Sequence, residues 1–520
     1  MYMKKYKFSL IALISGMLIL GSCSEDILDV PALGRYVGDP DPNAPLDYSM
    51  VNGEAIGLYS YVNMCYNNGW GYSTYVTLNV ASDDAVSGGA SAGDRPEYEA
   101  ADKFTLDPNN QGTIALFSRF YGGIAKCNKF LDSYPERNKD TVLRCRAEAK
   151  FLRAFYYFNL VNLYGDIPLP LSSTAPGDLP QVPRDTVFNQ IEKDLIDAIK
   201  DLPASKAQLT DDDKLITRAT KNTARALLGK VYVYHSTLLG ANKWAEAKEQ
   251  LDAVVNSGEY QLVNDFRSLW SSTNEMKDGN PENIFEAYYT DAFGWGWNGV
   301  PRGNLDMQLM GIRDLNGYPG LDGGWGFCRP TQKLVDVFIS ESDSIRLDAT
   351  VVAEDWPDAV KPWETQGKLH KSLKTAGASY SDPYDGTGYW NGKYRQDEHP
   401  INAQMYAQNE VIMRYAEVLL LLAEVEYKLG NEAKARDYMN QIRARVHLPA
   451  KNSSGEQLWK DIVKEKQMEL ALESVRYWDL IRWNMAADEI PNFRVDRKGL
   501  WPFPLNQLQV DPNLKQNPGY

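Results

Sequence analysis

A helical pattern of apolar residues runs through residues 144–164. The apolar positions recur at spacings of three and four, and they are Ala147, Phe151, Phe155, Phe158 and Val161. This spacing places them on one face of an α-helix. The charged side chains of the segment fall largely away from that face, and Gly165 follows Tyr164, as is typical of a helix end. The pattern predicts an amphipathic core helix.

Two later segments are similar to repeated helix–turn–helix units. In residues 416–445, Ala423, Gly430 and Ala435 stand at the offsets that a tetratricopeptide unit uses. Small side chains at such positions let paired helices approach, and a glycine suits the turn between them. Residues 223–256 follow a similar plan with a longer connection. Together these segments predict a solenoid-like helical scaffold.

The rest of the chain carries fewer helical periods. Residues 50–65 predict a helix, and the helical pattern resumes near residue 113, whereas residues 66–112 are rich in Gly, Asn and Asp and predict mostly loop. Residues 280–410 combine short apolar runs with many Gly and Trp, which indicates a large loop-rich excursion from the scaffold. The predicted fold class is therefore mainly α, with a helical scaffold that carries loops.

The first residues have the pattern of a lipoprotein export signal. Three lysines precede an apolar stretch over residues 8–20, which is too short to span a bilayer, and Leu20-Gly21-Ser22 leads to Cys23. We expect cleavage before Cys23 and acylation of its thiol, which would hold the protein on a membrane. The expected parts of the chain are a signal peptide at 1–22, a lipid-anchored spacer at 23–45, and one domain at 46–520 with sections 46–280 and 281–520.

The composition excludes several classes of function. The net charge of −14 opposes nucleic-acid binding, which needs clustered Lys and Arg. The chain has no Cys-x-x-Cys pair, and its four histidines are scattered singly, so we expect neither a zinc site nor any other cofactor. The four cysteines after Cys23 favour free, mostly buried thiols over a disulfide scaffold.

Three patterns that resemble catalytic motifs do not predict an enzyme. A Gly-x-Ser-x-Gly match at 89–93 lacks flanks typical of a strand and a helix, and a Gly-x-Gly-x-x-Gly match at 294–299 is not followed by a helix. Glu469 and Glu473 lie four residues apart, in a stretch that also holds Arg476, Asp479 and Arg482. This spacing favours a ladder of charge pairs on one helix over two carboxyl groups facing each other across a cleft.

Aromatic residues in glycine-rich loops are the remaining candidates for function. Exposed rings stack on the C–H faces of sugars, while nearby carboxylate and guanidinium groups bind the hydroxyls. The candidate ligand-binding residues are Trp70, Tyr72, Asp83, Asp84, Arg95, Trp295, Trp297 and Trp325. The alternative is that each ring closes a loop against the protein body and that the two acids cap a helix or lie in a solvated loop.

Several motifs occur in one order along the chain. They include Cys23-Ser-Glu-Asp-Ile-Leu-Asp, Arg146-Ala-Glu-Ala-Lys-Phe-Leu-Arg-Ala-Phe-Tyr-Tyr-Phe, Gly323-Gly-Trp-Gly-Phe-Cys-Arg-Pro-Thr, Arg476-Tyr-Trp-Asp-Leu-Ile-Arg-Trp and Gln516-Asn-Pro-Gly-Tyr. With these motifs the chain resembles the SusD/RagB family of surface glycan-binding lipoproteins, from Cys23 to Tyr520.

The resemblance implies a helical fold with four tetratricopeptide-like units, a loop-rich ligand face and no catalytic activity. It also implies a partner, a SusC-like TonB-dependent transporter in the Gram-negative outer membrane, to which the lipoprotein delivers a captured glycan at the cell surface. By position, Asp83 and Asp84 resemble the polar edge of the family's glycan site, and Trp325 resembles an aromatic near it.

Other functions stay open at this stage. The same scaffold suits a peptide-capturing lipoprotein of a RagAB-like import system. A surface enzyme would need a cleft with paired carboxylates, and a pure assembly scaffold would bury its aromatic residues.

Overall fold

The computed structural model describes residues 46–66, 72–215, 217–270, 279–289, 303–321, 323–381, 384–394 and 407–520. Asp47–Tyr520 forms one compact unit. The predicted signal peptide, the lipidation site Cys23 and the spacer lie outside the described residues.

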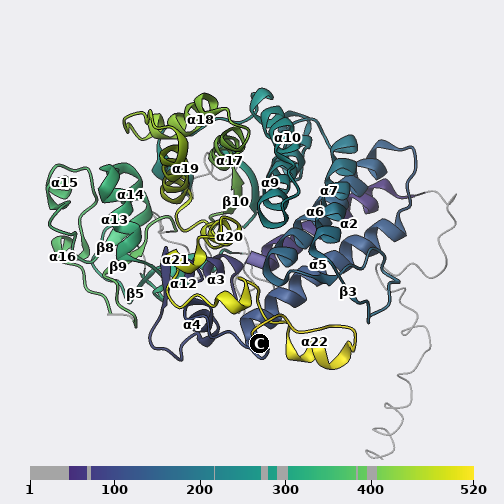
Figure 1. The fold of residues 1–520 in the computed structure, drawn as a ribbon, viewed down its shortest axis with the longest axis horizontal. Coiled ribbons are helices and arrows are strands. Elements are labelled where there is room, and N and C mark those ends of the chain that lie inside the picture. Colours follow the sequence, from purple (N-terminus) through teal and green to yellow (C-terminus); the bar gives the residue numbers. More distant parts are fainter. Residues whose placement is uncertain are drawn as a thin grey trace, which may run out of the picture. The chain divides into compact units, whose positions relative to one another are not determined.

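The longer helices provide the scaffold. They are α2 (Tyr48–Tyr66), α5 (Gln111–Ser133), α6 (Asp140–Tyr164), α7 (Arg184–Asp201), α9 (Lys221–Leu239), α10 (Trp244–Asn256), α17 (Tyr415–Lys428), α18 (Glu432–Arg445) and α19 (Gly455–Leu470). From α5 to α18 each of these helices packs on the next one along the chain, and α10 contacts α17 across the long insertion between them (Figure 1). This order confirms the mainly α, repeat-like fold class.

Both predicted helix–turn–helix units are present. Between α17 and α18, Gly430 adopts a φ of 80°, a conformation that costs glycine little. Ala423 and Ala435 are fully buried where these two helices meet, together with Met439. Small residues at these positions therefore do allow the close approach.

The second unit pairs α9 with α10. A Cβ atom at Gly229 would lie 2.5 Å from the side chain of Leu251, so the contact between the two helices requires glycine there. Thr220 begins α9 with a capping box, and Gly240 ends the helix in the left-handed region.

The predicted amphipathic helix at 144–164 is longer and more deeply buried than expected. It forms α6, and every residue from Ala147 to Tyr164 except Lys150 is buried. Two of its charged side chains are inside and paired, Glu148 with Arg218 and Arg153 with Asp194. The helix lies among neighbouring helices, so its polar face meets protein rather than water.

Short elements fill the segments predicted as loop. The short helices are α3 (Thr74–Val80), α4 (Pro96–Asp102), α8 (Asp211–Leu215), α12 (Asp306–Met310), α13 (Gln332–Glu341), α14 (Ser344–Thr350), α15 (Lys361–Thr365), α16 (Leu373–Ala376), α20 (Arg476–Arg482), α21 (Ala486–Glu489) and α22 (Leu505–Val510), with 3₁₀ turns at Lys206–Gln208, Phe266–Trp270 and Val495–Arg497. The stretch 66–112, predicted as mostly loop, contains the short helices α3 and α4 and the strand β1 between irregular segments.

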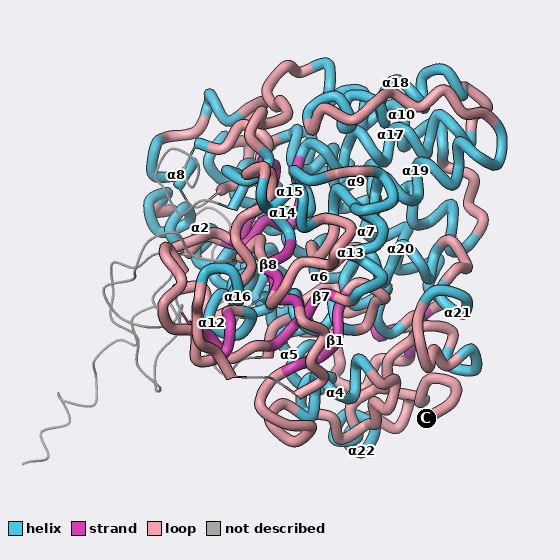
Figure 2. Tube along the Cα trace, turned by 90° about the vertical axis from the view of Figure 1, so that its left-hand side faces the viewer, coloured by secondary structure: helices cyan, strands magenta, loops and turns pink. Residues whose placement is uncertain are grey.

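The strands are short and pair in twos. They are β1 (Ala85–Gly88), β2 (Ile167–Pro168), β3 (Gln181–Val182), β4 (Asn283–Ala287), β5 (Ile312–Arg313), β6 (Gly323–Gly324), β7 (Phe327–Pro330), β8 (Val351–Ala353), β9 (Tyr389–Asn391) and β10 (Glu410–Arg414). The pairs β1–β7, β2–β3, β4–β10 and β8–β9 are antiparallel, and β5–β6 is parallel. Figure 2 shows β1, β7 and β8 within a region dominated by loops, which agrees with a loop-rich excursion on the scaffold.

Two further expectations concern cysteines and membrane spans. Within the described residues, Cys65, Cys127, Cys145 and Cys328 are buried free thiols, as predicted. None of the helices in that part of the chain combines the length and the apolar character that crossing a membrane requires.

Candidate ligand-binding face

The loop after β1 and the turn before β7 form the frame of the candidate site. The N–H of Gly89 donates to the carbonyl of Gly326 over 2.9 Å. A Cβ atom at Gly88 would lie 2.3 Å from that same carbonyl oxygen, so the two loops can approach this closely only with glycine at position 88. Trp325 stands one residue before this contact and is partly exposed.

Arg313 links the two loops through its side chain. Its Nη1 donates to the backbone carbonyl of Trp325 over 3.3 Å and lies 3.9 Å from Oδ2 of Asp94. Asp94 also accepts a hydrogen bond from the N–H of Ala90 over 2.8 Å, which closes the loop after β1. Asp94 and Arg313 keep 34% and 26% of their side-chain surface exposed, so both present charge to solvent beside Trp325.

Tyr384 brings a third segment to the same place. Its N–H donates to the carbonyl of Gly89 over 2.9 Å, and its side chain is 36% exposed. We call the surface formed by Asp94, Arg95, Arg313, Trp325 and Tyr384 the Trp325 face.

Two of the predicted residues, Tyr72 and Arg95, lie together. The Arg95 guanidinium lies 5.8 Å from the ring centroid of Tyr72, and that of Arg119 lies 5.9 Å from it. These are cation–π distances. Arg119 also donates to the Tyr72 carbonyl over 2.6 Å. Arg95 keeps 23% of its side-chain surface exposed and belongs to the rim of the Trp325 face.

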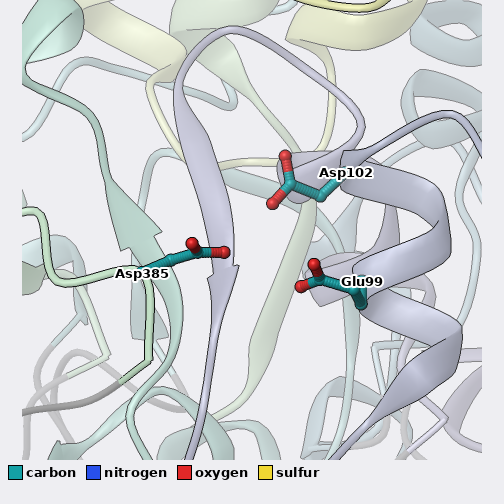
Figure 3. Close-up of side chains that lie close together, drawn as sticks. All are labelled: Glu99, Asp102 and Asp385. Atoms are coloured by element: carbon teal, nitrogen blue, oxygen red, sulfur yellow. The ribbon is translucent and has the colours of Figure 1, made fainter. Parts of the chain in front are cut away.

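Three carboxylates gather beside this face. Glu99 and Asp102 of α4 and Asp385 point toward one another in Figure 3, and their oxygens lie within 4.8 Å. The Lys103 ammonium contacts Asp102 over 3.2 Å and Asp385 over 3.3 Å, so the cluster already holds a cation of the chain. Burial is the main reason that the pKa of Asp102 lies above its ordinary value.

The structure corrects the roles expected for Asp83 and Asp84. Both side chains are buried, with exposures of 2% and 0%. Asp83 accepts two hydrogen bonds from Arg476, over 2.8 and 2.9 Å, and pairs with Lys333. Gln467 donates to Asp84 over 2.8 Å. These acids hold α20 and α19 against the loop before β1, and they offer a ligand no accessible oxygen.

Opposite environments shift the pKa values of the two acids in opposite directions. Burial alone would raise the pKa of Asp83, but the hydrogen bonds and charges of Arg476 and Lys333 lower it overall. Burial and the charge of Asp83 raise the pKa of Asp84 to about 6.

The predicted charge ladder is wrong for Glu469 and Glu473. α19 ends at Leu470, and α20 begins only at Arg476, so the two glutamates do not share one continuous helix with Asp479. Glu473 is buried and accepts from Arg414 and Lys393 over 2.7 and 2.6 Å. Within the predicted ladder, the pair Asp479–Arg482 does form locally, over 2.8 Å. Because both glutamates are internal and ion-paired, they do not form an open carboxylate cleft.

The surroundings of the Gly-x-Ser-x-Gly match also differ from expectation. β1 ends at Gly88, and α4 begins at Pro96, so a strand and a helix do flank the motif. Ser91, however, is exposed within the seven-residue connection 89–95 rather than directly between strand and helix. That geometry is not the sharp strand-to-helix elbow that activates a nucleophilic serine.

The structure thus brings together Tyr72, Arg95 and the surroundings of Trp325, and it removes Asp83 and Asp84 from the site. Trp70, Trp295 and Trp297 lie outside the described residues. Sequence reasoning missed Arg313, Asp94, Tyr384 and Asp385. The first three reach the face from separate loops without periodicity, so only their nearness to Gly and Trp in the sequence could have drawn attention to them.

The Trp325 face has the parts that binding a polar ring compound requires. An aromatic side chain lies beside a guanidinium and a carboxylate, and glycine loops hold these groups. Stacking together with charge-assisted hydrogen bonds is a common way to bind neutral, hydroxyl-rich ligands. The scaffold of paired helices and this face define a helical-repeat protein with a candidate ligand-binding surface built from loops.

Comparisons with known proteins identify the family. The SusD family model matches residues 281–495, and a second model, described as starch-binding associating with outer membrane, matches residues 58–233. A solved laminarin binding SusD-like protein is 30% identical, with a TM-score of 0.77 and coverage of 91% of this chain and 99% of its own. The chain belongs to the SusD family.

Two other relatives match across most of the chain. SusD-like protein P2 of Formosa agariphila is 27% identical, with 100% of each chain covered. The structure of surface glycan-binding protein A from Bacteroides fluxus is 26% identical, with a TM-score of 0.75 and coverage of 91% of this chain and 99% of its own.

Proposed function

We propose that this protein is a non-catalytic, glycan-binding lipoprotein of the outer-membrane surface. The observation that carries the proposal is Trp325, partly exposed in a glycine loop and flanked by Arg313 and Asp94, on a SusD-family scaffold. A relative that is 30% identical over nearly its whole length is described as laminarin binding. Laminarin oligosaccharides are therefore the first ligands to test.

We further propose that the protein is anchored at the outer membrane and works with a transporter there. Acylation of Cys23 would hold the protein at the outer membrane, in keeping with the family description that matches residues 58–233. From there it would pass a captured oligosaccharide to a SusC-like TonB-dependent transporter. Within the described residues, Glu469 and Glu473 both form buried ion pairs with Arg414, so neither is free to act as a catalytic acid or base. This supports binding without hydrolysis.

Titration calorimetry tests this function. Purified protein is titrated with laminarin oligosaccharides, with starch and other glycans, and with peptides of mixed sequence. Saturable glycan binding that weakens in Trp325→Ala supports the proposal. Binding to peptides alone would favour peptide capture, and release of reducing ends from a glycan by the pure protein would show an enzyme.

A further inference from the structure

Two carboxyl groups meet in the interior of the protein. Asp306 belongs to α12 and Glu410 to β10, and both side chains are fully buried. The two carboxyl groups are close neighbours, since each of them shifts the pKa of the other. Oδ2 of Asp306 also accepts a hydrogen bond from the Ser73 hydroxyl, over 2.7 Å.

The contact between these groups requires a proton. Among the described residues, no N–H or O–H group donates to Oδ1 of Asp306 or to either carboxylate oxygen of Glu410. An ionised carboxylate can only accept hydrogen bonds, so two of them cannot bond to each other. Two buried carboxylates without a counter-donor also repel. One carboxyl group of the pair is therefore protonated, and its O–H donates to the other.

The groups packed around the pair do not replace this proton. Among the residues that the structure describes, the charged neighbour is Arg119 on α5, which lowers the pKa of Asp306 but whose guanidinium donates to the Tyr72 carbonyl. The other titratable neighbours are neutral at ordinary pH, and they are Tyr75, Tyr98, Tyr289, Cys328 and Tyr394. Burial dominates and raises the pKa of Asp306 to about 7, and it raises that of Glu410 well above its ordinary value.

The pair is mechanically connected to the Trp325 face. In α12, two residues after Asp306, the carbonyl of Gln308 accepts the N–H of Trp325 over 2.8 Å. On the other side, Ser73, which bonds to Asp306, directly follows Tyr72 in the chain. A shift of α12 therefore displaces Trp325, and a loss of the Ser73 bond loosens the backbone next to Tyr72.

We propose that one proton shared by Asp306 and Glu410 locks α12 to α3 and β10, and that loss of this proton as the pH rises weakens ligand binding at the Trp325 face. The second half rests on the function proposed above, whereas the shared proton does not. Both acids act as positioning residues.

The direction of the pH effect follows from proton linkage. The folded pair keeps its proton to higher pH than the unfolded chain, whose carboxyl groups ionise near pH 4. Stability from the pair is complete below that pH and is lost as the pH rises toward 7. In Glu410→Gln, an amide N–H replaces the acid O–H, so the bond to Asp306 no longer needs a proton.

The experiment compares the wild-type protein, Glu410→Gln, Asp306→Asn and the control Asp84→Asn from pH 4.5 to 8. Urea unfolding and titration with laminarin oligosaccharide are measured at each pH. Relative to Glu410→Gln, the unfolding constant of the wild type should rise by up to about tenfold per pH unit between pH 5 and 7. The dissociation constant of the wild type for laminarin oligosaccharide should rise over the same pH range. The dissociation constant of Glu410→Gln should change less over that range. Asp84→Asn removes a buried acid outside the pair. The part of the pH dependence that comes from Asp306 and Glu410 should therefore remain in this variant.

A direct measurement of the proton covers the case in which both substitutions at the pair prevent folding. In Asp84→Asn at pH 6.5, infrared spectroscopy should show the C=O band of a protonated carboxylic acid in the folded protein. Absence of that band, or parallel unfolding profiles for wild type and Glu410→Gln, would overturn the shared proton. If the profiles diverge as expected but no glycan binds at any pH, the proposed function fails and the shared proton stands.

Discussion

The guanidinium of Arg313 donates a hydrogen bond to the backbone carbonyl of Trp325 over 3.3 Å. The same side chain lies 3.9 Å from Asp94, so one residue connects the loop that carries the tryptophan with the loop after β1. The Trp325 face is thus assembled from segments far apart in the sequence, and its parts can be tested separately.

We expect Trp325→Ala to weaken laminarin binding by about two- to tenfold, because ring stacking contributes about 0.5 to 1.5 kcal/mol. Trp325→Phe should keep part of the affinity. The matched control is Trp459→Ala, since Trp459 is also partly exposed but stacks on Tyr427 in the helical scaffold, with ring centroids 5.5 Å apart. Calorimetry measures all three. Equal losses in Trp325→Ala and Trp459→Ala would show that the effect is not local to the face.

For Arg313→Ala we expect weaker glycan binding with little change in stability. The variant removes a donor to the Trp325 loop and a charged group beside the ring. The ion pair of the wild-type Arg313 with Asp94 is partly exposed, and such pairs contribute about 0 to 1 kcal/mol to the free energy of folding. Binding and urea unfolding are measured in parallel. A variant that unfolds much more easily yet binds normally would contradict this role.

Asp83→Ala should destabilise the fold by about 3 to 5 kcal/mol, because it leaves Arg476 buried without its carboxylate. Urea unfolding measures the change. Asp496→Ala removes a carboxylate of a surface pair with Arg494 and should leave the unfolding midpoint unchanged. If Asp83→Ala is as stable as Asp496→Ala but loses glycan affinity, Asp83 is a ligand-binding residue after all.

A pH dependence is expected from Asp84. Its folded pKa is raised to about 6, so the folded protein holds a proton there that the unfolded chain has released by that pH. Wild-type stability should therefore fall, relative to that of Asp84→Asn, by about 2 to 3 kcal/mol as the pH rises from 4 to 6. Asn can still accept from Gln467, which keeps the native hydrogen bond. Parallel stability profiles for the two proteins over this range would contradict the raised pKa.

The helical scaffold could be predicted because its signals are local. Gly430 with the alanines 423 and 435 marks a helix pair within about thirty residues, and the structure has that pair. Helix ends at Gly165 and Gly240 follow equally local rules.

The site was harder to predict because its contacts are distant. Asp83 looked accessible in a polar, loop-like sequence, yet its partner Arg476 lies 393 positions away and fixes the carboxylate inside. Likewise, nothing near Arg313 indicates that its side chain reaches both Asp94 and the Trp325 carbonyl. Periodicity does not report such meetings between loops.

The central claim is that the Trp325 face binds a glycan, and a crystal structure with a laminarin oligosaccharide tests it most directly. We expect a sugar ring stacked on Trp325, with hydroxyls in contact with Arg313 or Asp94. An oligosaccharide bound with full occupancy on another surface, with the Trp325 face free of sugar, would contradict the claim.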